Sequence, residues 1–174
     1  MDKKIIYLSP SIQEYNVGNS DYGTEEKMMN KIADELEIIL ENTGRYIVYR
    51  NNPNMKINDI IVQSNRIKPD IHVALHSNAG GGVGPEVFAY KPGISADILA
   101  KDIYSSLLRV YYNKNYGRGV KYSTKIKELS KTKAPAVEIE IGFHDNANDV
   151  NWIKNNTYVI AQAIADGINT YFKK

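Results

Sequence analysis

Short apolar runs alternate along this chain with longer segments of helical period, and this order constrains the fold more than any other feature. Parallel strands need long crossover connections, which are usually helices. We therefore expect one three-layer αβα domain over residues 1–174, of the α/β class, with a mostly parallel or mixed central sheet flanked by helices. The expected strands are 4–8, 46–50, 70–76, 84–90 and 134–143, and the expected helices are 25–44, 57–68, 95–113, 149–155 and 158–174, with 117–124 as a loop.

Composition narrows the classes of function. The formal charge of +2 is too small to indicate nucleic-acid binding, and the absence of cysteine excludes disulfides and leaves only N and O ligands for any metal. No segment reaches the roughly 20 apolar residues of a membrane span, and the N-terminus does not read as a signal peptide. We expect a monomer that does not bind membranes. It would stay in the cytoplasm until released, or be a fragment of a secreted protein.

Two of the three histidines lie in one expected strand, within the stretch "DIHVALHSNAGGG". His72 and His76 share a face, but at about 3.3 Å per residue they are about 13 Å apart and cannot hold one ion together. His76 is at the carboxyl end of the strand, where α/β proteins collect functional groups, and is a candidate metal ligand. His72 lies in the middle of the strand and is expected to be a core histidine with a satisfied hydrogen bond.

Acidic residues occur where apolar residues are expected. Glu25 falls on the apolar face of the first helix and Glu26 about a quarter turn away, although Glu25 could simply interact with the positive end of that helix. Glu138 and Glu140 share one face of the last strand, where burial would require partners for their charges. The alternative is an edge strand with one solvent-exposed face, which suits Glu138 better than Glu140. A carboxylate, a histidine and a further N or O donor would suit zinc, and a separate glutamate could take a proton from zinc-bound water.

Four segments together resemble a known family. They are "TEEKMMNKIADELEIILENTG", "LHSNAGGGVGPEVFAY", "GRGVKYS" and "APAVEIEIGFHDN". In this order they are similar to motifs of the zinc-dependent N-acetylmuramoyl-L-alanine amidases of the Amidase_3 type. These are the peptidoglycan-cutting domains of bacterial autolysins, spore-lysis enzymes and phage endolysins.

The resemblance implies a cofactor, a substrate and roles for particular residues. Zn²⁺ would be bound by His76 and Glu25, with Glu26 as the fallback, and Glu140 would be the catalytic glutamate. The substrate would be peptidoglycan, approached over the triple glycine that follows Asn78. Asn78 and His144 are the expected substrate contacts.

One departure from the family concerns the first zinc histidine, which normally follows the first strand in Asp-Pro-Gly-His. Here the loop reads "SPSIQEYN", and Gln13 falls at or next to the missing ligand. A glutamine oxygen is a weaker donor than imidazole. His144 is a rival third ligand, and Glu14 and Tyr15 could also approach. The alternative function is a catalytically weakened peptidoglycan-binding module of the same fold. A zinc carboxypeptidase is disfavoured, because the chain has no His-x-x-Glu motif.

Overall fold

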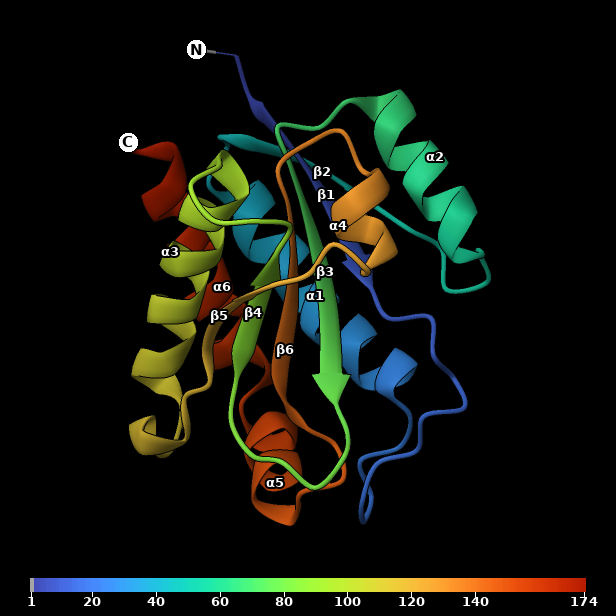
Figure 1. The fold of residues 1–174 in the computed structure, drawn as a ribbon, viewed down its shortest axis with the longest axis vertical. Coiled ribbons are helices and arrows are strands. Elements are labelled where there is room, and N and C mark those ends of the chain that lie inside the picture. The colour runs from blue at the N-terminus through green and yellow to red at the C-terminus, as the bar shows by residue number, and fades with distance from the viewer. Residues whose placement is uncertain (1) are drawn as a thin grey trace.

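A six-stranded sheet forms the centre of the computed structural model, which describes residues 2–174 (Figure 1). The strand order is β2-β1-β3-β6-β4-β5. The strands are β1 (Lys4–Pro10), β2 (Tyr46–Arg50), β3 (Ile71–Asn78), β4 (Glu86–Ala89), β5 (Gly119–Tyr122) and β6 (Ala136–Phe143). The helices are α1 (Glu25–Asn42), α2 (Ile57–Ile67), α3 (Ser95–Val110), α4 (Lys127–Lys131), α5 (Ala147–Asn155) and α6 (Thr157–Phe172), with a 3₁₀ turn at Lys114–Tyr116.

The sheet is mixed, as expected. Strands β2, β1, β3 and β6 are parallel, whereas β4 is antiparallel to β6 and pairs in parallel with β5. The prediction that 117–124 is a loop was wrong, because β5 occupies its centre. In this four-residue edge strand Val120 and Tyr122 alternate with Gly119 and Lys121, but the run is short and none of its residues is buried, so its pairing with β4 depends on tertiary contacts more than on the local pattern. Helix α4, in the lysine-rich stretch, was also not predicted.

The two faces of the sheet differ in chemistry. One face packs against α1, α3 and α6, and its side chains, such as Leu8, Leu75 and Ile139, belong to the main hydrophobic core. The opposite face lies under α2 and α4, which stand in front of the sheet in Figure 1. Because strand residues alternate between faces, this second face carries His72 and His76 of β3 together with Glu138 and Glu140 of β6.

Helix α1 begins and ends as its sequence indicates. The backbone N–H of Lys27 donates to Oγ1 of Thr24, the N-cap residue, and Gly44 follows the helix with a φ of +68°. The apolar stripe of α1 is buried in the core, and Glu25 is buried with it in the first turn. Within residues 2–174, no helix is both long and apolar enough to cross a bilayer.

Gly167 permits close packing of α6 against α3. A Cβ at this position would lie 2.5 Å from Cα and 2.9 Å from N of Ile103. Alanine is the better helix former by about 1 kcal/mol, yet this contact with backbone atoms leads us to expect Gly167→Ala to destabilise the fold by about 1–3 kcal/mol in urea unfolding. The exposed neighbour substitution Asp166→Ala should change stability by less than about 0.5 kcal/mol. A stabilised Gly167→Ala protein would contradict the close approach.

Candidate metal and catalytic site

The contact between His76 and Glu25 joins β3 to the start of α1. Nδ1 of His76 lies 2.8 Å from Oε1 of Glu25, whose residue is only 1% exposed. Glu26, the fallback ligand, instead lies within hydrogen-bonding distance of the Asn30 side chain. Of the two glutamates, the structure therefore brings Glu25 to His76.

Gln13 also reaches this group, through the loop after β1. Its Nε2 lies 3.4 Å from His76 Nδ1, and its Oε1 accepts a hydrogen bond of 2.7 Å from Asn16. The same Asn16 amide donates to Oε2 of Glu25 at 2.7 Å. Gln13 thus presents its nitrogen to His76, and the amide must turn over before its oxygen can face an ion there. Sequence reasoning missed Asn16, since a single polar residue in a polar loop carries no pattern.

Glu140 lies beside His76 because β3 and β6 pair in parallel with these two residues in register. Its Oε2 is buried and has no hydrogen-bond partner in the part of the chain that the structure describes. Burial raises the pKa of Glu140 to about 8; the charge of His76 opposes the shift, and the carboxylates of Glu138 and Glu25 add to it. This carboxyl group can therefore hold or release a proton near neutral pH.

The acidic surroundings change the protonation of His76. Burial lowers its pKa, but the hydrogen bond to Glu25 and the charges of Glu138 and Glu140 outweigh burial and raise the pKa to about 10. The ring of the metal-free protein is therefore protonated at neutral pH. Binding of a metal to either ring nitrogen would displace a proton.

Glu138 does not lie on an edge strand with a solvent-exposed face, which was the alternative expected from the sequence. Strand β6 lies inside the sheet, between β3 and β4, so the edge-strand explanation was wrong. Oε2 of Glu138 lies 4.0 Å from Nε2 of His76. Glu128 of α4 completes a group in which one ligand atom from each of His76, Glu128 and Glu138 lies within 4.8 Å of the others. No sequence pattern indicated Glu128, because it reaches the site only through the placement of α4.

His72 is a core histidine, as predicted. It is fully buried, its Nδ1 lies 2.9 Å from Oγ of Ser64, and its Nε2 lies 2.8 Å from Oε1 of Glu128. The ring stacks on Tyr7 at a centroid distance of 5.1 Å. Both nitrogens of His72 are therefore occupied by protein groups.

The two expected substrate contacts are held by protein groups. Nδ2 of Asn78 donates to Oε1 of Glu86 at 2.8 Å. His144 is buried, and its Nδ1 lies 2.9 Å from Oγ of Ser77. Since neighbouring strand residues alternate, Ser77 points away from the face that carries His76. The structure does not bring His144 to His76, so a role for His144 as third ligand gains no support.

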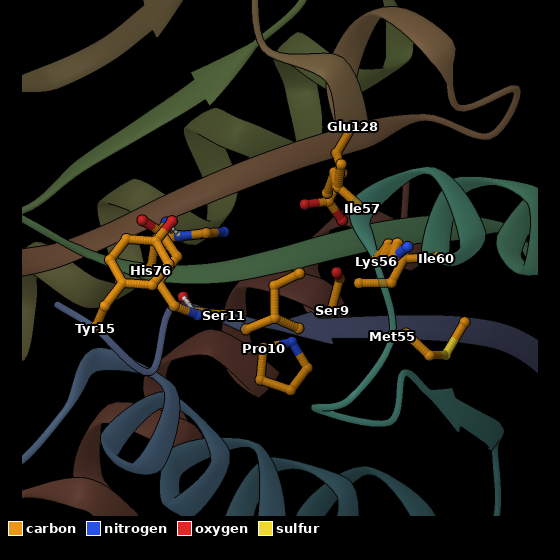
Figure 2. A pocket seen from close by; sticks show the side chains of 12 residues that line it. Ser9, Pro10, Ser11, Tyr15, Met55, Lys56, Ile57, Ile60, His76 and Glu128 are labelled. Carbon is orange, nitrogen blue, oxygen red and sulfur yellow. Dashed lines mark hydrogen bonds between the residues drawn. The ribbon is translucent and has the colours of Figure 1, made fainter.

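A cavity of about 530 Å³ opens beside His76, between the end of β1 and the start of α2. Gln13, His76 and Glu128 line it together with apolar side chains of α2. Figure 2 shows Tyr15 and His76 at one end of this cavity and Met55 and Ile60 toward the other. Tyr15 is 76% exposed, so the cavity is bordered on the His76 side by an accessible aromatic ring.

The αβα fold places an imidazole, several carboxylates and a cavity at the carboxyl edge of its parallel strands. This combination is suited to metal-dependent hydrolysis. Comparison with known proteins identifies the family. The model of the family Amidase_3, N-acetylmuramoyl-L-alanine amidase, matches residues 6–170. The chain belongs to this family.

Individual relatives are distant. The N-acetylmuramoyl-L-alanine amidase CwlM of Bacillus licheniformis is 27% identical over 176 residues, which cover 96% of this chain and 68% of that protein. The sporulation-specific N-acetylmuramoyl-L-alanine amidase of Bacillus subtilis is 25% identical over 175 residues, with the same coverage of 96% and 68%. Among solved structures, the amidase AmiC2 of Nostoc punctiforme has the same fold, with a TM-score of 0.86 at 19% identity and 98% of both chains covered. The catalytic domain of the CD27L endolysin, which targets Clostridia Difficile, has a TM-score of 0.76 at 25% identity, with 96% and 97% covered.

The raised pKa of Glu140 predicts how the stability of the metal-free protein depends on pH. The unfolded chain releases this proton near the ordinary value of 4.5, and the folded protein near 8, so the stabilisation is present below 4.5 and lost as pH rises through 8. In EDTA, Glu140→Gln should therefore lose less stability than the parent between about pH 5 and pH 9 in thermal unfolding. Parallel curves for the two proteins would show that this carboxyl group titrates normally.

Proposed function

We propose that this chain hydrolyses the amide bond between N-acetylmuramic acid and L-alanine in bacterial peptidoglycan, with zinc as its cofactor. The observation that carries the proposal is the convergence of Glu25, His76 and Glu140, from three separate elements, in a member of the amidase family. The proposed bond is the one named in the description of the family and in the names of its relatives, the N-acetylmuramoyl-L-alanine amide.

The residues present fit a zinc ion. Imidazole nitrogen and carboxylate or amide oxygen are ligands that zinc accepts, and the sequence has no cysteine to compete with them. The buried, unpartnered Oε2 of Glu140 and the nearby carboxylates of Glu25 and Glu138 leave an excess of negative charge around one imidazole. A divalent cation would offset that charge.

His76 and Glu25 would hold the ion, with Gln13 as the proposed third ligand once its amide turns over. Bound zinc supplies Lewis acidity, which polarises a carbonyl oxygen and lowers the pKa of a water molecule. Asn16 would steady two of these ligands, since it donates to both Gln13 and Glu25.

Glu140 would act as the general base and then as the general acid. Its carboxylate would accept a proton from the attacking water and return it to the amine nitrogen of the departing L-alanine. A pKa of about 8 suits a group that must both accept and donate a proton near neutral pH.

The absence of a histidine at or next to position 13 favours one alternative, a peptidoglycan-binding module that has lost its chemistry. Glu140 supports an enzyme instead. A buried carboxyl group without a partner is costly to maintain, and binding a neutral glycan does not require one.

Replacing the proposed base separates these two functions. Glu140→Gln should lower the rate of turbidity loss of purified cell walls by at least about 100-fold, because the amide cannot take the proton from water. Zinc retained after dialysis, measured by atomic absorption, should be unchanged, and the exposed-site variant Glu41→Gln should lyse walls like the parent. If Glu140→Gln lyses walls at the parent's rate, Glu140 is not the base. A parent protein that binds walls without cutting them would favour the binding module.

A further inference from the structure

The imidazole of His76 offers a second nitrogen that the proposed catalytic arrangement does not use. Nδ1 contacts Glu25 and Gln13, whereas Nε2 makes no hydrogen bond within residues 2–174 and faces Glu138 at 4.0 Å. The two sides of this one ring therefore meet two different sets of side chains. His76 and Glu128 also line the 530 Å³ cavity, which gives small solutes a route to the Nε2 side.

The Nε2 side holds two carboxylates. The side chain of Glu138 is only 13% exposed and makes no hydrogen bond in the described part of the chain. Glu128 is 4% exposed at its side chain and reaches the cavity from α4 (Figure 2). Their ligand atoms and that of His76 lie within 4.8 Å of one another. Three ligands that share one zinc ion at about 2.1 Å lie about 3.4–3.6 Å from one another, so each ligand atom would have to shift by up to about 0.7 Å toward a common centre.

Two of these three groups are already oriented by contacts with other polar side chains. Glu25 contacts Nδ1 of His76, which directs Nε2 toward Glu138. His72 contacts Glu128 and is itself held by Ser64. In metal sites, a ligating histidine usually donates its other ring N–H to a carboxylate, and ligating carboxylates are hydrogen-bonded in turn. The arrangement around Nε2 has both features.

We propose that Nε2 of His76, Glu128 and Glu138 form a binding site for a divalent cation of the zinc type. It is distinct from the position on the Nδ1 side that the family resemblance implies. One nitrogen and two carboxylates leave a coordination position open to water from the cavity. While an ion is bound here, Nδ1 keeps its proton and Glu25 orients the histidine by accepting it, so an ion held by Glu25 and Gln13 on the Nδ1 side belongs to a separate state of the same ring. The site concerns metal binding alone and does not depend on amide hydrolysis.

The position of the ion tests the proposal directly. Crystals of the full chain soaked in Zn²⁺ alone would be measured at the zinc absorption edge. We expect an anomalous peak within about 2.3 Å of Nε2 of His76 and of a carboxylate oxygen of Glu138. The peak should vanish in crystals of Glu138→Gln. A peak bound only on the Nδ1 side, a peak that survives Glu138→Gln, or no peak at all would overturn the proposal.

Calorimetric titration with Zn²⁺ gives a second readout in solution. Glu138→Gln breaks no hydrogen bond, so the variant should fold, and we expect it to weaken zinc binding by at least about 10-fold. The matched control Glu41→Gln removes an exposed carboxylate at the far end of α1 and should leave the Kd within about twofold of the parent. An unchanged Kd and stoichiometry in Glu138→Gln would count against the site. Because neither experiment measures lysis, failure of the proposed function would leave both results interpretable.

Discussion

The parallel pairing of β3 with β6 is the constraint on which the site depends. It sets His76 and Glu140 in register on one face, and it places Ala74 opposite Glu138 two residues earlier. A slip by a single residue would turn both glutamates into the hydrophobic layer under α1 and α6. The apolar residues that alternate with them, Val137, Ile139 and Ile141, are fully buried on that other face and oppose any such slip. The hydrophobic core therefore fixes the geometry of the polar site.

The polar face brings together more negative charge than its histidines can balance. Glu25, Glu128, Glu138 and Glu140 all act electrostatically on His76 or respond to it, and the pKa of Glu140 rises as a result of burial and this crowding. Such a cluster is expensive in a protein interior unless protons or a cation offset it. In the metal-free protein the raised pKa values of His76 and Glu140 favour protons on both groups. A divalent cation would replace them and leave Glu140 free to accept a proton from substrate water.

Much of this arrangement could be predicted from the sequence, because local patterns encode it. The period of two in "VEIEIGF" gave the shared face of Glu138 and Glu140, and the apolar stripe of α1 selected Glu25 over Glu26. The position of His76 at a strand end and of His72 within the strand separated their roles. What the sequence could not predict depends on contacts between distant segments. The approach of Glu128 on α4 and the double contact of Asn16 have no local signature. The alternation in β5 covers only four residues, too few to predict its pairing with β4. The expected position of His144 in the cleft assumed that the chain after β6 turns toward His76, whereas its side chain turns to Ser77.

The central claim concerns the bond that is cut, and analysis of the products tests it most directly. Purified peptidoglycan would be digested with the zinc-loaded protein, and the new amino groups and reducing ends would be labelled and identified by mass spectrometry. Our account predicts that alanine is the only residue to gain a free amino terminus and that the glycan strands stay intact. New reducing sugars, new amino termini on other residues, or no new termini at all would contradict it.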